Sequence, residues 1–196
     1  MSTDVRFLLV RHPETVANVE GRYVGRGNTP FTERGNIQAT LLAEHIVSFR
    51  PAALYTSPLR RARVVAEQAS VRLGVDPIVD VRFTELDFGL AEGLTYAETS
   101  ERGVQFDFAS PDAPVAIGGE SRNEIYDRVA RTLDAVPHAF DRVAIVTHGG
   151  VFRSAIAHLL GLPRQAIWSF HIQNGSVAEI RVLDGHGMVE EFRTIG

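Results

Sequence analysis

Four residues that can bind or attack phosphate stand just after short apolar segments of the chain: Arg11, His12, Arg61 and His148. A guanidinium group binds phosphate through paired hydrogen bonds, and a neutral imidazole nitrogen can attack phosphorus. Taken singly, an arginine is usually a solvated charge and a histidine usually a satisfied polar residue, but here the same placement recurs along the chain. Because arginine repels metal ions, the pattern predicts a phosphate site rather than a metal site.

The composition excludes several other chemistries. The chain has no cysteine, and all 20 of its basic residues are arginine, so it has no thiolate nucleophile, disulfide, Walker lysine or Schiff-base lysine. Its net charge of −4 argues against nucleic acid or an anionic membrane as the main partner, since both recruit basic surfaces. No apolar run is long enough to span a bilayer and none resembles a signal peptide, so a cytoplasmic location is expected.

The apolar segments are predicted to be β-strands that end at one edge of a sheet. They are short and nearly continuous, as is typical of strands buried on both faces, and they cover residues 5–10, 52–56 and 143–147. Each precedes a segment with helical spacing, at about residues 32–49, 57–73 and 151–160. Strands that alternate with helices form mainly parallel sheets, which bind ligands at the carboxyl ends of their strands. The chemistry is therefore expected on that rim, beside helix N-termini that favour anions.

Turn and capping residues set the expected helix boundaries. Thr32 precedes the first helix, and residues 57–58 are predicted to supply the N-cap and first-turn proline of the second helix, which ends before Gly74. The two glycines at residues 149–150 are predicted to form a turn that leads into the third helix at Val151.

The C-terminal part of the chain is predicted to add antiparallel strands. Its β-branched and aromatic runs, separated by Asn-Gly and Asp-Gly turn signals, cover residues 166–172, 176–183 and 188–194. We therefore predict an α/β fold, a three-layer sandwich with a mainly parallel central sheet, helices on both faces and antiparallel edge strands near the C-terminus. Residues 1–196 are expected to form a single domain.

A long excursion at about residues 86–119, just after Glu85, is expected to cover the active site. It is rich in Gly, Pro, Ala and acidic residues and has weak periodicity. Residues 86–117 contain six acidic residues and one basic residue, so this cover should repel anions. The sequence thus predicts substrates with a neutral or partly apolar body, lined by Phe88, Tyr96, Phe106 and Phe108, unless these aromatic side chains only pack the excursion onto the domain.

Residues 9–18, LVRHPETVAN, resemble the Arg-His-Gly-Glu-Thr-x-x-Asn signature of the histidine phosphatase superfamily, also called the phosphoglycerate mutase-like family. Further segments resemble that family's motifs in the family's order, at residues 29–39, 56–62, 85–95, 118–121, 146–150 and 174–177. A single Arg-His pair would be weak support. These blocks cover nearly the whole chain, and together they make a specific match.

The resemblance implies a role for each matching residue. His12 is the implied nucleophile, and His148 is the second stabilising histidine. Arg11 and Arg61 are implied as the phosphate clamp and Glu85 as the proton donor. The full substrate-binding set implied by the match is Arg11, Asn18, Arg22, Gly25, Arg61, His148 and Gly149. Other acids stay open for the role of Glu85: Glu14, Asp87, Glu92 and Glu120. No metal and no cofactor is implied.

Two positions depart from the family pattern. Pro13 stands where the family usually has glycine, and proline removes a backbone N–H and fixes φ near about −65°. Val24 stands where mutase-like members often carry a hydroxyl residue that touches substrate.

The sequence therefore predicts an enzyme, a phosphatase that hydrolyses small-molecule phosphate monoesters through a phosphohistidine intermediate on His12. Two alternatives remain open: a primer-dependent phosphoglycerate mutase, and a non-catalytic phosphate-binding homologue. The non-catalytic reading requires a lost catalytic group, and only Pro13 favours it. The expected partner is a small phosphate ester, and the sequence is compatible with a homodimer.

Overall fold

Six strands in the described part of the chain form one mixed sheet in the order β3-β2-β4-β1-β5-β6. The computed structural model describes residues 3–104, 106, 110–136 and 139–196. Strands β3, β2, β4 and β1 are parallel, and β5 and β6 pair antiparallel at one edge. Their bounds are Asp4–Arg11 for β1, Ala53–Thr56 for β2, Ile78–Val79 for β3, Arg142–Thr147 for β4, Ser176–Leu183 for β5 and His186–Thr194 for β6. The predicted α/β class and its antiparallel edge are confirmed.

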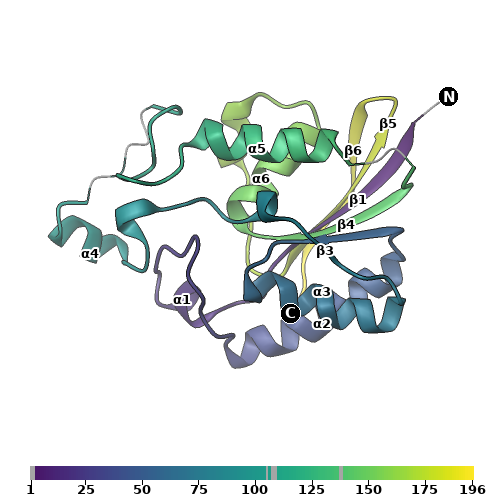
Figure 1. Ribbon diagram of the computed structural model, residues 1–196, viewed down its shortest axis with the longest axis horizontal. Coiled ribbons are helices and arrows are strands. Elements are labelled where there is room, and N and C mark those ends of the chain that lie inside the picture. The colour runs from purple at the N-terminus through teal and green to yellow at the C-terminus, as the bar shows by residue number, and fades with distance from the viewer. Residues whose placement is uncertain (1–2, 105, 107–109, 137–138) are drawn as a thin grey trace.

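Helices cover both faces of the sheet (Figure 1). One face packs against α2 and α3, and the other against α5 and α6. Strand β1 shows why: Leu8 and Val10 belong to the core on the α2–α3 side, while Phe7 and Leu9 belong to the core on the α5–α6 side. An apolar strand buried on both faces needs such a layer on each side. The helices span Glu33–Phe49 (α2), Arg60–Leu73 (α3), Arg122–Asp134 (α5) and Gly149–Leu159 (α6).

Two predicted helix starts are wrong, and in both cases a site contact explains the difference. Helix α3 begins at Arg60 rather than at residues 57–58, because the Ser57 hydroxyl accepts from the Leu59 N–H and contacts a histidine ring instead of capping the helix. Helix α6 begins at Gly149. The paired glycines therefore form its first turn rather than a separate turn, and the Gly150 N–H donates to a carboxylate.

The predicted strand at residues 166–172 is also wrong. Residues Arg164–Ser169 form a 3₁₀-helix, η3, and both edges of β1 are already paired, with β4 and β5. The hairpin between β5 and β6 is confirmed, and its Asp184-Gly185 turn has positive φ at both residues, 49° and 79°, as a type I′ turn requires.

The excursion extends beyond the carboxyl ends of the strands, away from the sheet (Figure 1). It carries a short 3₁₀-helix, η2 (Gly89–Ala91), and helix α4 (Tyr96–Glu101), and it follows another 3₁₀-helix, η1 (Val81–Phe83). It pairs with the loop after α1 (Val16–Val19), because the Tyr23 N–H donates to the Leu94 carbonyl and the Gly93 N–H donates to the Tyr23 carbonyl. The cover is therefore built from two segments. No helix in the described residues is long and apolar enough to cross a membrane.

Candidate active site

Strands β1, β2 and β4 end level with one another, which brings their following residues together. In the register, Arg11 pairs with Thr147 and Thr56 pairs with Val146. The ladder continues one step further, since the His12 N–H donates to the Thr147 carbonyl at 2.9 Å. As a result the rings of His12 and His148 lie 5.1 Å apart, centroid to centroid.

A cavity of about 180 Å³ opens at this rim. It is lined by Arg11, His12, Thr15, Asn18, Arg22, Tyr23, Val24, Thr29, Arg61, Glu85, Phe88, Gly149 and Arg153. Most of the residues implied by the motifs are therefore brought together, and two are not among the lining residues: Gly25 and His148. Within the described ranges, no group of three His, Asp or Glu side chains could hold a metal ion.

The orientation of the His12 ring is fixed by its neighbour in the chain. His12 is 3% exposed, and its Nδ1 lies 2.7 Å from the Pro13 carbonyl oxygen. A carbonyl can only accept, so Nδ1 carries the hydrogen and the lone pair of the neutral ring is on Nε2. The Asn174 amide donates to the His12 and Pro13 carbonyls and to Asn18 Oδ1. Residue 13 thus orients the His12 ring through its carbonyl oxygen. Proline lacks the backbone N–H but keeps this carbonyl, so Pro13 can replace glycine here.

The His12 ring is held in its neutral form. Burial, together with the charges of Arg61 and Arg11, keeps the pKa of this imidazole well below its ordinary value, and the hydrogen bond to Pro13 opposes the shift. A neutral imidazole is the nucleophilic form. Burial and the neighbouring arginines thus favour the form of His12 that a nucleophilic role requires.

The two arginines of the implied clamp are held differently. Burial is the main reason why the pKa of Arg11 falls to about 10, and its buried Nε has no hydrogen-bond partner in the described residues. One Nη of Arg11 donates to the Ile172 carbonyl. Arg61 is 3% exposed and donates through its Nη atoms to carbonyls of the loop at residues 24–27. Arg11 is therefore open to an anion, whereas Arg61 also braces the loop.

His148 supports Arg61 instead of lining the cavity. The Arg61 Nε–H donates to His148 Nδ1 at 3.2 Å, so the neutral His148 ring carries its hydrogen on Nε2 and donates to Ser57 Oγ at 2.8 Å. Burial, with the charge of Arg61 next in effect, holds the pKa of His148 well below its ordinary value. Both of its ring nitrogens are engaged in this arrangement.

Glu85 places a carboxylate between the arginines and the first turn of α6. It is 9% exposed and accepts from the Gly150 N–H at 3.0 and 3.2 Å and from the Leu86 N–H at 2.9 Å. Its charge acts on both Arg11 and Arg61. Glu85 can therefore exchange a proton with a ligand held in the cavity that it lines.

The sequence profile of the histidine phosphatase superfamily (branch 1) matches residues 7–194. The chain belongs to this superfamily. Phosphoserine phosphatase 1 of Hydrogenobacter thermophilus is 31% identical, with 94% of this chain and 90% of that protein aligned. A probable phosphoglycerate mutase of Cronobacter sakazakii is 32% identical, with 88% and 82% aligned. The solved α-ribazole phosphatase of Shigella flexneri has a TM-score of 0.85 at 26% identity, covering 98% of each chain.

The acids that were left open for proton transfer are engaged outside the cavity of this histidine phosphatase. Glu14 contacts Thr32 and Arg34, and Glu120 is paired with Arg128. Asp87 lies 3.6 Å from the Arg26 guanidinium. Among the described residues that line the cavity, Glu85 is the one carboxylate.

Glu92 holds the loop that Arg61 braces. Its carboxylate accepts from the backbone N–H groups of Gly25, Arg26 and Gly27 at 2.9, 3.1 and 2.8 Å. Gly25 therefore has its N–H bound to Glu92 and its carbonyl bound to Arg61. A Cβ at Gly25 would stand 2.1 Å from the Leu86 carbonyl oxygen, so this glycine allows the loop to approach the excursion.

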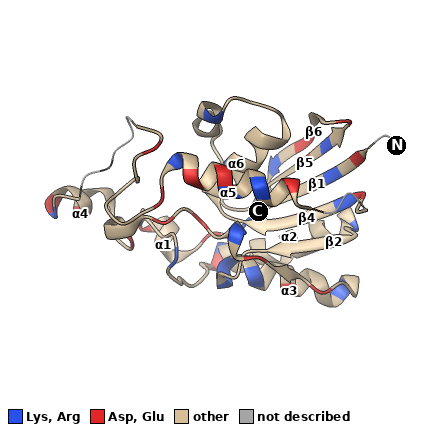
Figure 2. Ribbon diagram, turned by 45° about the horizontal axis from the view of Figure 1, so that its top comes forward, with Lys and Arg blue, Asp and Glu red and all other residues tan. Residues whose placement is uncertain are grey.

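Three acidic residues of the cover have partners outside the excursion, so a count of its charges does not give the charge that faces the cavity. Figure 2 shows acidic residues on α4 and its flanking loops. Glu98 accepts from Arg22, Asp87 pairs with Arg26, and Glu92 binds the loop N–H groups. The wall that a ligand meets carries more arginine than carboxylate. Of the aromatic side chains expected to line the site, Phe88 does.

The other expected lining aromatics lie elsewhere. Tyr96 is 70% exposed. Phe106 packs against Tyr23, with ring centroids 4.6 Å apart, and so supports the wall from behind. Phe108 lies outside the described residues.

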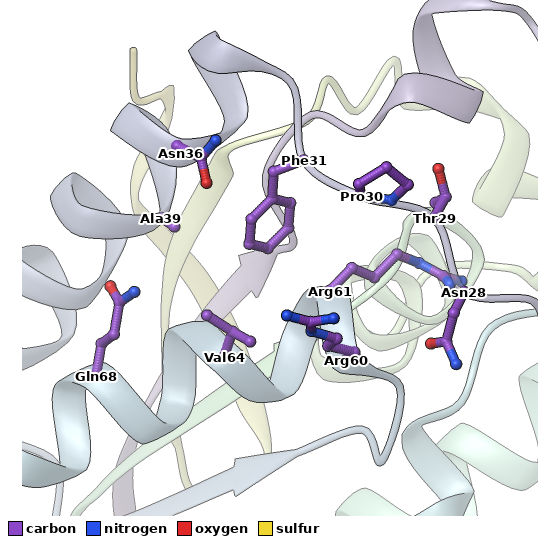
Figure 3. A pocket seen from close by; sticks show the side chains of 10 residues that line it. All are labelled: Asn28, Thr29, Pro30, Phe31, Asn36, Ala39, Arg60, Arg61, Val64 and Gln68. Atoms are coloured by element: carbon purple, nitrogen blue, oxygen red, sulfur yellow. The ribbon is translucent and has the colours of Figure 1, made fainter.

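A larger cavity, about 470 Å³, lies on the other side of Arg61 between α2 and α3 (Figure 3). Figure 3 shows the Arg61 side chain extending toward Asn28 and Thr29, with the Phe31 ring pointing into the space between the helices. Neither histidine nor Glu85 lines this cavity. The smaller cavity is therefore the candidate active site.

Sequence reasoning missed four residues that line the site: Thr15, Tyr23, Thr29 and Arg153. Arg153 could have been found, because it stands four positions after Gly149 on one helix and residues at that spacing share a face. Thr15, Tyr23 and Thr29 lie in loops, whose path no periodicity predicts.

Proposed function

We propose that this chain is a phosphatase that hydrolyses small-molecule phosphate monoesters through a phosphohistidine intermediate on His12. The observation that carries the proposal is the His12 ring, which is buried and neutral, with Nδ1–H bound to the Pro13 carbonyl and Nε2 left as the nucleophile. The membership in the histidine phosphatase superfamily and the phosphatase relatives support it.

In the first step, His12 Nε2 attacks phosphorus, a P–N bond forms, and the bond from phosphorus to the ester oxygen breaks. The transferring group carries negative charge on its oxygens, which fixed donors stabilise without reorganisation. The donors available are the Arg11 guanidinium, the Asn18 amide nitrogen and the Gly149 N–H at the start of α6, where backbone N–H groups lack intrahelical partners.

Glu85 enters the cycle as the carboxylic acid, and the leaving alkoxide takes its proton. The resulting carboxylate then removes a proton from the water that attacks the phosphohistidine, which releases inorganic phosphate and restores both residues. The other groups act through positioning: His148 orients Arg61, and Asn174 holds the backbone around His12.

We expect phosphate release to exceed isomerisation when the protein is given 3-phosphoglycerate and a bisphosphate primer. A mutase must keep a bisphosphate bound while it reorients, and a cavity of about 180 Å³ favours a single compact ester. Inorganic phosphate and the ratio of phosphoglycerate isomers would be followed together. Rapid interconversion with negligible phosphate release would instead assign the chain to the mutase activity suggested by the Cronobacter relative.

We also expect activity to survive removal of divalent metal ions. The proposed site stabilises phosphate charge with arginines and N–H groups, and a divalent ion would compete with them for the same oxygens. Dialysis against a strong chelator should leave the rate unchanged, while a metal-dependent phosphatase treated in parallel loses activity. Loss that is rescued by added Mg²⁺ or Zn²⁺ would contradict this site chemistry.

A further inference from the structure

We propose that Arg153 is a specificity-determining residue that binds a carboxylate of the substrate, next to the phosphate held by Arg11. The proposal rests on the phosphatase function above and extends it to a substrate class: compact phosphate esters that carry a carboxylate. None of the motifs in the sequence assigned a role to this residue.

Arg153 lies beside the proposed phosphate position. It lines the cavity from α6, its Nε donates to the Phe170 carbonyl at 2.9 Å, and its guanidinium lies 5.5 Å from the centre of the Trp168 ring. A Cβ built on Gly149 would stand 3.2 Å from Arg153 Nη1 and 3.4 Å from Arg11 Cζ. The two guanidinium groups therefore flank the same backbone position.

The charge of Arg153 is less compensated than that of Arg22, which lines the same cavity. Arg22 forms salt bridges with Glu20 at 2.6 Å and Glu98 at 2.8 Å. None of the described carboxylates forms a salt bridge with Arg153. Burial lowers the pKa of Arg153, and the charge of Glu85 opposes that shift. A partly buried cation without an ion-pair partner gains most from a bound anion.

The phosphate itself does not require Arg153. Asn18 Oδ1 already accepts from Thr15 and Asn174, so the Asn18 amide nitrogen remains for a ligand. Together with the Arg11 guanidinium and the first N–H of α6, it supplies enough donors for the three phosphate oxygens. Arg153 is then free for a second anionic group.

The second group must be close to the phosphate. The Phe88 and Tyr23 rings, with centroids 5.3 Å apart, also line the cavity. Its volume of about 180 Å³ leaves room for a few carbon atoms. A carboxylate matches the planar guanidinium fork through two parallel hydrogen bonds. A short phosphorylated carboxylic acid fits the volume of the cavity and supplies the carboxylate for Arg153.

The test compares two substrate pairs that differ in the carboxylate: O-phosphoserine with O-phosphoethanolamine, and 3-phosphoglycerate with glycerol 3-phosphate. The wild-type protein should prefer the carboxylate member of each pair in kcat/KM. Arg153→Gln should lower that preference about 10- to 100-fold, as loss of a charged partner in a closed site does. Arg153→Lys, which keeps the charge, should retain part of it. Arg131→Gln, an exposed charge on α5, should leave it unchanged.

The ratio within each pair does not depend on the fraction of folded protein, so a destabilised variant still gives an answer. A ratio that Arg153→Gln leaves unchanged would overturn the proposal, whether or not the rates on all esters fall together. p-Nitrophenyl phosphate separates the two proposals. If the wild type releases phosphate from it but shows no carboxylate preference, only this inference fails; if the wild type releases none from any ester, the phosphatase function fails.

Discussion

His12→Ala is expected to lower kcat by about 10⁵-fold or more, as removal of a catalytic nucleophile does in other covalent enzymes. The cavity offers no substitute, because His148 has both ring nitrogens engaged by Arg61 and Ser57. Steady-state phosphate release from an aryl ester would measure the loss. The exposed His186 gives a matched control, and His186→Ala should keep wild-type activity.

The same variant tests the covalent intermediate. Rapid quench of the wild type with ³²P-labelled substrate should trap an adduct that is stable in base and labile in acid, the behaviour of a phosphoramidate. His12→Ala should form none, while His186→Ala should form as much as the wild type. If His12→Ala keeps more than about one hundredth of the wild-type rate, direct attack by water has to replace the two-step mechanism.

The sequence predicted the parts of the fold whose pattern is local. Leu8, Leu9 and Val10 form a continuous apolar run, and each is fully buried between helical layers. Because parallel strands end at one edge, the meeting of Arg11 and His12 with His148 followed from topology alone. The positive-φ turn at residues 184–185 was predictable from its local sequence, since Asp-Gly is suited to it.

Other elements needed tertiary information. Ser57 has the sequence of an N-cap, but its hydroxyl contacts His148, which lies far away in the chain. The aromatic and β-branched run at residues 166–172 has the composition of a strand, yet its Phe170 and Ile172 carbonyls accept from the side chains of Arg153 and Arg11. Tertiary contacts override local propensity in both cases. Helix α5 was not predicted, although Ser121 and Glu124 form a capping box before buried Ile125 and Val129.

The charge of the site could not be read from composition. A count over the excursion gave an acidic cover, but the partners of its acids lie in another segment: Arg22 for Glu98 and the loop N–H groups for Glu92. Net charge along a stretch of chain does not give the charge that faces a cavity. Helical spacing in the sequence indicates that Arg153 shares a face with Gly149. That Arg153 has no ion-pair partner among the described carboxylates could be seen only in the three-dimensional structure.

Glu85→Gln is expected to lower kcat/KM for alkyl phosphates by about 10²- to 10⁴-fold, the usual contribution of a general acid. Glutamine is nearly isosteric and its Oε1 can still accept from the Gly150 and Leu86 N–H groups, so the cavity should keep its shape. Aryl phosphates have a leaving group that needs little protonation, and formation of the phosphoenzyme from them should be much less affected. Rapid-quench rates on a matched alkyl and aryl ester would measure the two losses.

The second role of Glu85 gives this variant a signature of its own. Because water activation also depends on the carboxylate, Glu85→Gln should accumulate phosphohistidine when it turns over an aryl phosphate, with a burst of the phenol followed by slow phosphate release. Glu14→Gln and Asp87→Asn are matched controls, since both acids lie outside the cavity lining, and they should show neither the burst nor a change in the alkyl-to-aryl ratio. Equal losses in the phosphorylation step on both esters would remove Glu85 from the acid role. If Glu85→Gln forms the phosphoenzyme at the normal rate but shows no burst of the phenol, another group activates the water.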